Sequence, residues 1–267
     1  FYELLRQMSA FRLEQPGPVT PPKTRINEFK ALHETVENLL QSNISSYRSQ
    51  KEFIENAAHE LQTPLAITIG KLEALTQQSQ FSGQELQLVT SAMDNLQRLV
   101  RLNRSLLLIS RIHNRQFTSE AGINLNELTR KILGDFSDQA SYQDIKITLM
   151  ETGACRAEMN EDLAHILITN LVKNALTHNH KGGFIKVEML DHGLRIQNSG
   201  EEKSLDAAAI FTRFYHASNT GRSTGLGLSI VKAICDLYHF KIVYRHENAH
   251  IFILDFPEQK HKHQADS

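Results

Sequence analysis

Residues 53–65 read Phe-Ile-Glu-Asn-Ala-Ala-His-Glu-Leu-Gln-Thr-Pro-Leu, a stretch with helical periodicity that places a histidine beside a carboxylate. Its apolar residues recur every three or four positions and continue beyond it, which predicts a helix buried along one face: Ile54, Ala58, Leu61, Leu65, Leu72 and Leu75. His59 lies one position off this apolar seam, so we expect its ring to face solvent. Glu60 can accept the proton of one ring nitrogen and leave the other as a nucleophile. The pair therefore predicts an exposed chemical site.

The composition is that of a globular protein long enough for about two domains. The 267 residues are 40% hydrophobic and 22% charged, with a formal net charge of −1, which gives no electrostatic case for binding nucleic acid. Cys155 and Cys235 are far apart and near no histidine at metal-ligand spacing, which argues against a disulfide framework or structural zinc. The sequence contains no run of about 18 apolar residues, the length that would predict a membrane span. Because the sequence begins at Phe1 without a signal-peptide pattern, we interpret it as a fragment.

The first part of the chain is predicted to be helical. A short helix over residues 1–13 is followed by one long helix from about 26 to 77 and a second from about 83 to 113. The short polar turn between the long helices predicts an antiparallel hairpin. One hairpin cannot bury two such broad apolar stripes, so we expect it to pair with a second copy in a dimeric four-helix bundle. The alternative is packing against the rest of the same chain.

The second part of the chain alternates between strands and helices. Beyond a linker at residues 115–121, this pattern predicts an α/β sandwich domain over residues 122–257, with helices against a sheet. Residues 258–267 are expected to form a disordered tail. The predicted helices lie at about 124–141, 160–178 and 225–239, and the predicted strands at 144–151, 183–190, 193–198, 241–246 and 250–256.

Two asparagines on an apolar helix face are the first sign of a ligand site. Asn170 and Asn174 share the inward face of the helix predicted at 160–178. A carboxamide on a core face is costly unless it is hydrogen-bonded, so this pair predicts a polar ligand or a metal. Asparagine oxygens suit Mg²⁺ that is held mainly by phosphate and water. The alternative is that both side chains bond to neighbouring backbone.

Glycines that open the helix predicted at 225–239 are the second sign. Gly225 and Gly227 let the backbone approach a phosphate, which the free N–H groups of a helix start also favour. A P-loop is excluded because its Lys-[Ser/Thr] ending is absent, and Ile230 occupies the third glycine position of a dinucleotide fingerprint. The alternative is a flexible loop with a helix cap.

A turn signal and an aromatic cluster complete the set. Asn198-Ser199-Gly200 ends a predicted strand and either places Asn198 beside a ligand or forms a plain turn. Phe211, Phe214 and Tyr215 follow; they either anchor a mobile lid or form a small satellite core.

Taken in order, these motifs resemble the cytoplasmic half of a bacterial sensor histidine kinase over about residues 25–257. The series that carries the resemblance is His59-Glu60-x-x-Thr63-Pro64, Asn170-x-x-x-Asn174, Asn198-Ser199-Gly200, Phe211 with Phe214, and Gly225-x-Gly227. The resemblance implies a membrane-proximal signal-relay segment at 1–47, a dimerisation and phosphoacceptor hairpin at 48–114, and an ATP-binding domain of the gyrase, chaperone and histidine-kinase type. It also implies the cytoplasmic part of an inner-membrane protein.

The resemblance assigns roles to residues of this chain. His59 is the implied phosphoacceptor, Glu60 its activating residue, and Thr63 the polar residue that positions water for dephosphorylating a response regulator. Asn174 is the implied Mg²⁺ ligand, and Pro64 is a candidate for bending the helix to gate the reaction. The residues implied in binding ATP are Asn170, Asn174, His178, Asn198, Gly200, Phe211, Phe214, Gly225, Leu226 and Gly227.

Three departures from the family pattern bear on ATP. Asn198 replaces the acidic residue that reads the adenine amino group, and its box lacks the second glycine. Thr177 and His178 stand where a lysine and a tyrosine are common. An asparagine oxygen still accepts from the amine, so we expect adenine recognition with altered affinity.

The expected function is autophosphorylation of His59 from Mg·ATP followed by transfer to an aspartate of a response regulator. Two alternatives remain open: a signalling scaffold that binds ATP weakly, and a chaperone-like ATPase without a phosphohistidine.

Overall fold

The computed structural model describes residues 26–78, 81–117, 119–200, 204–215 and 224–257; for residues 27, 28, 46–59 and 78 it describes only the helical backbone. The chain divides into two compact units, residues 1–96 and 97–267. The predicted helix at 1–13, most of the predicted signal-relay segment and the predicted tail lie outside the described residues.

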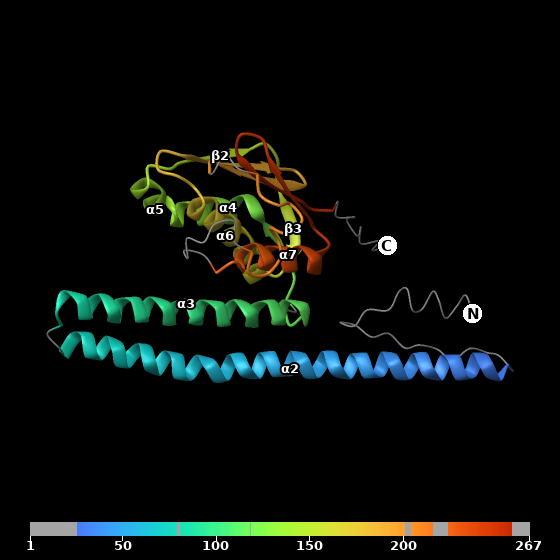
Figure 1. Cartoon of the computed structure of the whole chain (residues 1–267). Coiled ribbons are helices and arrows are strands. Elements are labelled where there is room, and N and C mark those ends of the chain that lie inside the picture. Colours follow the sequence, from blue (N-terminus) through green and yellow to red (C-terminus); the bar gives the residue numbers. More distant parts are fainter. Residues whose placement is uncertain (1–25, 79–80, 118, 201–203, 216–223, 258–267) are drawn as a thin grey trace. The chain divides into compact units, whose positions relative to one another are not determined.

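The first unit is built from α2 (Asn27–Gln78) and the start of α3 (Gly83–His113), which confirms both predicted long helices. Ser82 and Glu85 form a capping box at the start of α3: the Ser82 N–H donates to Glu85 Oε2 at 2.9 Å, and the Glu85 N–H donates to Ser82 Oγ at 3.4 Å. The chain thus reverses between α2 and α3, and the two helices run side by side in this unit (Figure 1).

The α2 helix continues through Pro64. Because proline has no N–H, the carbonyl of Glu60 receives no helical hydrogen bond from position 64. The carbonyl of Pro64 in turn accepts a hydrogen bond from Thr68 Oγ1 at 2.7 Å, a contact that often bends helices. The regular hydrogen-bond ladder is therefore weakened directly after His59, as the sequence predicts.

The second unit contains a five-stranded sheet in the order β2-β4-β5-β7-β6 and a two-stranded sheet of β1 and β3. The β2–β4 pair is parallel, and the other pairs are antiparallel. The strands of this unit are β1 (Ala121–Asn124), β2 (Lys146–Glu151), β3 (Arg156–Met159), β4 (Phe184–Leu190), β5 (Gly193–Asn198), β6 (Lys241–His246) and β7 (His250–Asp255).

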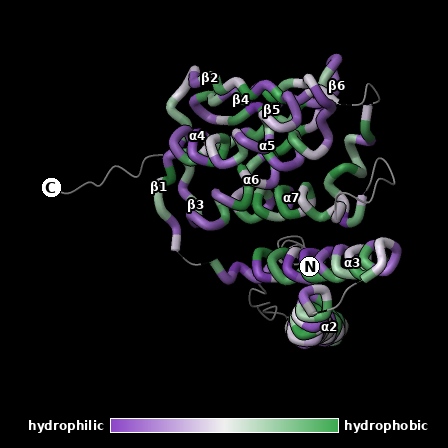
Figure 2. The backbone as a smooth tube through the Cα atoms, turned by 90° about the vertical axis from the view of Figure 1, so that its left-hand side faces the viewer, coloured by the Kyte–Doolittle hydropathy of each residue, from purple (hydrophilic) through white to green (hydrophobic). Residues whose placement is uncertain are grey.

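Helices pack against one face of the five-stranded sheet (Figure 1). They are α4 (Leu125–Asp135), α5 (Ser137–Tyr142), α6 (Glu161–Thr177) and α7 (Gly227–Tyr238). The hydrophobic positions gather on α6, α7 and the strands that they face (Figure 2). In α6 the buried residues include Leu163, Leu167 and Leu171, so the predicted apolar stripe is the centre of the core. An α/β sandwich therefore follows the helical hairpin, as predicted.

The sequence-based prediction of one helix over 124–141 is wrong. The helix ends at Asp135, and α5 starts at Ser137 after the half-buried Phe136. Gly134 is a poor helix former, and Ser137 Oγ donates to its carbonyl oxygen at 2.7 Å, which favours a break at this point. The short strands β1 and β3 were not predicted, because four residues carry too little periodicity.

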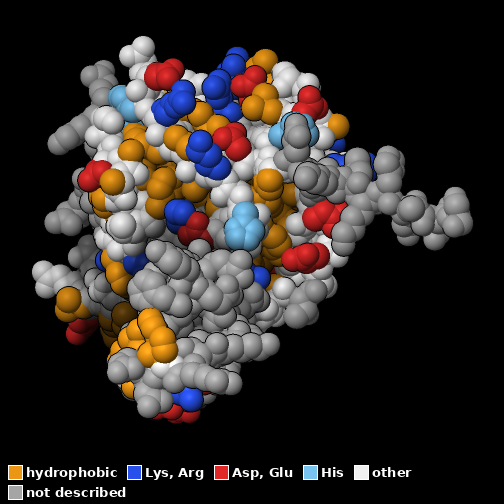
Figure 3. Space-filling view, turned by 90° about the vertical axis from the view of Figure 1, so that its right-hand side faces the viewer, with side chains coloured by type: hydrophobic (Ala, Val, Ile, Leu, Met, Phe, Trp, Pro, Cys, Tyr) orange, Lys and Arg blue, Asp and Glu red, His pale blue; other side chains and the backbone are white. Residues whose placement is uncertain are grey.

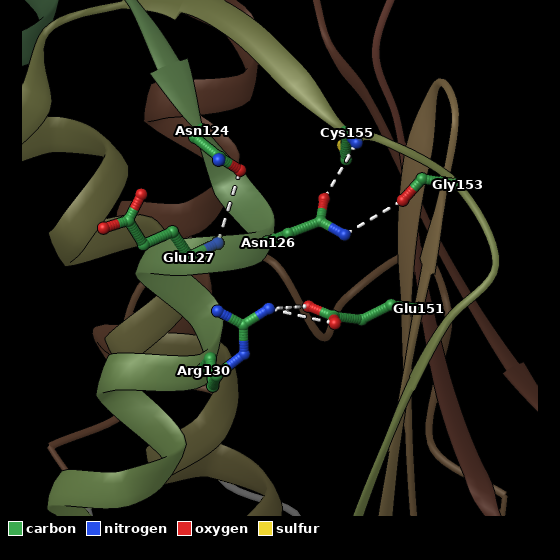
Figure 4. A network of polar contacts seen from close by, with 7 residues as sticks. All are labelled: Asn124, Asn126, Glu127, Arg130, Glu151, Gly153 and Cys155. Carbon is green, nitrogen blue, oxygen red and sulfur yellow. Dashed lines mark hydrogen bonds and ion pairs between the residues drawn. The ribbon is translucent and has the colours of Figure 1, made fainter.

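The start of α4 is fixed to the turn between β2 and β3 by polar contacts (Figure 4). Asn126 Oδ1 accepts a hydrogen bond from the Cys155 N–H at 2.8 Å, and Asn126 Nδ2 donates to the Gly153 carbonyl at 2.9 Å. One turn later, Arg130 Nη2 lies 2.7 and 3.0 Å from the two carboxylate oxygens of Glu151. These contacts hold α4 in register with the sheet.

Lysine, arginine, aspartate and glutamate side chains are interspersed on the face shown in Figure 3. In the described part of the chain, no helix is both long and apolar enough to cross a bilayer.

Candidate functional site

The Asn198 side chain, at the end of β5, has a buried oxygen that lacks a partner. The residue is 1% exposed, and its Nδ2 donates to the Ser199 carbonyl at 2.9 Å. Among the described residues its Oδ1 accepts no hydrogen bond. An unsatisfied buried acceptor costs about 1–3 kcal/mol. This oxygen is therefore ready for a donor from a ligand, such as an exocyclic amine.

Ser199 ties this turn to the end of α6. Its Oγ donates to Asn179 Oδ1 at 2.7 Å and accepts from the Phe184 N–H at 2.7 Å. Asn179 Nδ2 also donates to the Phe184 carbonyl at 3.0 Å. The two side chains and the backbone groups of Phe184 form a closed network that fixes the position of Asn198. The sequence analysis did not assign a role to Ser199 or Asn179; the serine inside the Asn-Ser-Gly turn was the only available signal.

Gly200 and Gly227 stand where the chain has no room for a side chain. A β-carbon on Gly200 would lie 2.7 Å from Cδ2 of His250 and 2.8 Å from the His178 carbonyl oxygen. A β-carbon on Gly227 would lie 3.1 Å from Asn170 Oδ1. The structure therefore brings the first asparagine of α6 against the glycine that opens α7.

Asn170 and Asn174 are both half-buried on α6. Asn170 Nδ2 donates to the Ile166 carbonyl at 2.8 Å, so the amide nitrogen bonds to neighbouring backbone, as one of the two interpretations expected. The amide oxygen, Oδ1, faces Gly227. Among the described residues no hydrogen bond is made by the Asn174 side chain. No cluster of three or more histidine, cysteine, aspartate or glutamate side chains suited to a metal occurs in the described ranges.

Leu226 and Gly225 shape the entrance to α7. Leu226 is fully buried, and Gly225 has a φ of +68°, a left-handed conformation that glycine adopts without strain. His178 caps α6 with an exposed side chain, and its N–H donates to the Asn174 carbonyl at 3.1 Å. The backbone carbonyl oxygen of His178 therefore lies beside Gly200.

The aromatic residues join the main core and do not form a separate one. Phe211 and Tyr215 are partly buried against that core, and the rings of Phe211 and Phe252 meet edge to face at 6.5 Å. Phe214 is 54% exposed and has a φ of +62°, while its N–H donates to the Gly225 carbonyl at 2.9 Å. A bulky residue in this conformation is strained. Residues 216–223, between these aromatic residues and Gly225, lie outside the described residues.

The predicted acceptor site lies on α2, in the other unit. The backbone of His59 is helical, and its side chain is outside the described set. Glu60 and Thr63 are both exposed. The structure therefore gives Glu60 free access to solvent beside the histidine.

An open cleft of about 840 Å³ lies between α5 and the end of α6. It is lined by Gln139, Tyr142, Gln143, Thr177, Asn179, His180 and Lys181. It shares Asn179 with the Ser199 network.

The family of the chain follows from two matches in sequence. Residues 49–115 match the His Kinase A phospho-acceptor domain, and residues 159–260 match the histidine kinase-, DNA gyrase B- and HSP90-like ATPase domain. The chain belongs to the histidine kinases. The first match includes His59, Glu60 and Thr63, and the second contains the asparagine and glycine motifs. The family resemblance and the expected fold class are confirmed, and the kinase class implies use of ATP.

Similar curated proteins are named as sensor proteins. The chain is 30% identical over 222 residues to the heme sensor protein HssS of Staphylococcus saprophyticus, which covers 81% of this chain and 48% of that protein. It is 26% identical over 240 residues to the sensor protein IrlS of Burkholderia pseudomallei, covering 86% of this chain and 51% of IrlS. The chain therefore spans about half the length of these relatives.

A solved structure supports the fold. The full-length ShkA structure in complex with AMPPNP matches with a TM-score of 0.62 and 20% identity over 77% of this chain and 45% of ShkA.

Proposed function

We propose that the chain transfers the γ-phosphoryl group of ATP to a ring nitrogen of His59, and that this group passes to an aspartate of a response regulator receiver domain. The phospho-acceptor and ATPase matches support the pairing of the two activities in one chain. The observation that carries the nucleotide half is the buried, unpartnered Oδ1 of Asn198. Adenine presents an amine donor that satisfies this acceptor.

The nucleotide site takes its shape from the two glycines. The adenine ring lies by Asn198 and Gly200, where a β-carbon on Gly200 would meet the His250 ring and the His178 carbonyl. The phosphates lie toward the start of α7, whose free N–H groups and helix dipole favour an anion. Asn170 Oδ1 and Gly227 mark this end of the site.

The Asn174 side chain is the proposed Mg²⁺ ligand. When bound, Mg²⁺ would neutralise charge on the phosphates. A carboxamide oxygen fits such an ion, because Mg²⁺ is usually held by few protein ligands together with phosphate and water. The half-buried Asn174, one helical turn from Asn170, meets this requirement.

The acceptor half uses His59 and Glu60. As the nitrogen–phosphorus bond forms, the bond from the γ-phosphorus to the oxygen of the departing ADP breaks, and the proton of the other ring nitrogen is shared with Glu60. Glu60 is an exposed carboxylate on the same helix, so it is free to take this role. Positioning and charge neutralisation account for most of the rate in such transfers.

We also propose a homodimer. The hairpin leaves large apolar side chains exposed on both helices, and a second copy would cover them in a four-helix bundle. These residues are Leu61, Ile67, Leu75, Leu86 and Leu88. The exposed Thr63 suits the proposed role of positioning water for dephosphorylation of the regulator. Attachment to a membrane stays a prediction from the family resemblance.

The test is to incubate the protein with Mg²⁺ and γ-labelled ATP beside His59→Gln. We expect an acid-labile, alkali-stable label that the variant lacks. Steady ATP turnover that survives His59→Gln, with no label in either protein, would instead favour the chaperone-like ATPase. Absence of both label and ATP binding would favour the scaffold.

A further inference from the structure

Two polar aromatic side chains are buried at the edge of the sheet that borders the nucleotide site. Tyr244 on β6 is 6% exposed, and His250 on β7 is 5% exposed. Tyr244 Oη lies 2.8 Å from His250 Nδ1. The same oxygen accepts a hydrogen bond from the Leu205 N–H at 3.2 Å. Which of the two groups donates in the hydrogen bond between Tyr244 and His250 depends on the tautomer of the histidine ring.

His250 lies beside the residues proposed to bind adenine. It is the direct cross-strand partner of Asn198 in the antiparallel β5–β7 pair. Its Cδ2 and Nε2 lie 2.7 and 3.0 Å from the position of a β-carbon on Gly200. The imidazole thus fills the space that the missing side chain of Gly200 leaves, and a displacement of this ring changes the wall of the site.

Leu205 lies at the start of the described segment 204–215, which carries both phenylalanines of the predicted lid region. Leu205 is half-buried against the core. The exit of the segment is tied by the hydrogen bond from the Phe214 N–H to the Gly225 carbonyl, at 2.9 Å. The start of the segment is held by the hydrogen bond from the Leu205 N–H to Tyr244 Oη, and the same oxygen is hydrogen-bonded to His250 Nδ1.

We propose that Tyr244 and His250 are a positioning pair that couples nucleotide binding to the order of residues 204–215. A base bound at Asn198 and Gly200 holds the His250 ring, the ring holds Tyr244 Oη, and this oxygen holds the Leu205 N–H. By linkage, an ordered segment also strengthens nucleotide binding. The inference rests on the nucleotide half of the proposed function and is independent of phosphoryl transfer to His59.

Tyr244→Phe is the sharpest perturbation. It keeps the ring that packs 5.3 Å from the Phe252 ring, so the fold is retained, and it removes only the hydroxyl. We expect binding of AMPPNP to weaken about tenfold, which corresponds to about 1.4 kcal/mol. His250→Leu removes the same hydrogen bond from the other side, and the double variant should bind no more weakly than the weaker single variant.

The matched control is Tyr238→Phe. The hydroxyl of Tyr238 also accepts one backbone N–H, from Asn160 at 3.0 Å, but it contacts neither the nucleotide site nor the segment. This variant loses the same kind of bond, so it reports the effect of a general loss of stability. We expect its AMPPNP affinity to equal that of the wild type.

The measurement is amide hydrogen exchange of residues 204–215 in the whole chain, with and without Mg²⁺ and AMPPNP. We expect the nucleotide to slow exchange of these amides in the wild type and in Tyr238→Phe. In Tyr244→Phe we expect no slowing, even when the protein is saturated with the nucleotide. Equal slowing in Tyr244→Phe, or equal loss in Tyr238→Phe, overturns the inference while leaving the proposed function intact. A wild type that does not bind AMPPNP overturns both, and calorimetry on the same sample identifies that case.

Discussion

Replacing Asn198 with leucine should separate nucleotide binding from stability. The side chains are similar in size, but leucine has no acceptor. In the free protein the change removes an unsatisfied buried oxygen, which costs about 1–3 kcal/mol, and loses the Nδ2 hydrogen bond to Ser199, which contributes about 0.5–1.5 kcal/mol. The free energy of unfolding should therefore fall by no more than about 0.5 kcal/mol or rise by up to about 2.5 kcal/mol.

ATP binding should change in the opposite direction. The amine of adenine satisfies Asn198 Oδ1 only in the bound state, so its loss should remove about 1–3 kcal/mol of binding free energy, a decrease in affinity of about fivefold to more than a hundredfold. Isothermal calorimetry measures the affinity, and urea unfolding measures the stability. An unchanged ATP affinity would refute the reasoning, because the orphan acceptor would then have no part in binding.

A control for this experiment is Asn160→Leu. Asn160 is also buried, but its Oδ1 accepts from the Leu163 N–H at 3.1 Å and its Nδ2 donates to Ser119 Oγ at 3.0 Å. Its replacement should lower stability by about 1–3 kcal/mol and leave the ATP affinity near that of the wild type. Asn198→Asp supplies the complementary change: a charged acceptor should bind the amine more tightly while the buried charge destabilises the free protein.

Three further predictions concern other parts of the chain. Ser199→Ala should lower stability by about 1–3 kcal/mol and weaken ATP binding, because it leaves the Phe184 N–H and Asn179 Oδ1 without Ser199; an unchanged urea midpoint and calorimetric affinity would contradict this. Pro64→Ala should strengthen α2 and shift the ratio of autophosphorylation to dephosphorylation, measured with labelled phosphate; the same rates for both reactions as in the wild type would end the gating hypothesis. Burial raises the pKa of Cys155 to about 11 and that of Cys235 to about 12. As the pH rises, the thiols lose their protons in the unfolded chain before they do so in the folded one. Their contribution to the free energy of unfolding should therefore be constant below about pH 9. Above it, stability should fall by up to about 1.4 kcal/mol per pH unit for each thiol until the pH reaches the folded-state pKa values. Urea unfolding between pH 8 and 11 measures this slope, which should be smaller in Cys235→Ala; an identical slope would exclude the thiol as its cause.

The sequence predicted the long elements well because their periodicity extends over many turns. The bounds of α3 agree with the expected ones, and those of α2 and α6 differ from them by one residue at each end. The strands β4 and β5 were found because buried and exposed residues alternate along them. In contrast, the break at Phe136 depends on a side-chain hydrogen bond to the Gly134 carbonyl, which no periodic pattern reports.

Parts of the site were predictable where a residue type at a given position has a single physical explanation. Gly227 faces Asn170 so closely that a larger residue would crowd it, and both were singled out from the sequence. Ser199, Asn179, Tyr244 and His250 were missed because their contacts are made between different strands and turns, which no periodic pattern within one element reports. Their residue types are ordinary for strands and turns, so only the fold reveals what they contact.

Mapping the phosphoryl group tests the central claim most directly. The wild-type protein is incubated with Mg²⁺ and ATP, digested at neutral to alkaline pH, and its peptides are read by mass spectrometry beside those of Asn198→Leu. The account predicts phosphate on His59 in the wild type and a much lower occupancy in the variant at the same subsaturating ATP concentration. Phosphate on another residue, or an unmodified His59 in protein that binds ATP, would contradict it.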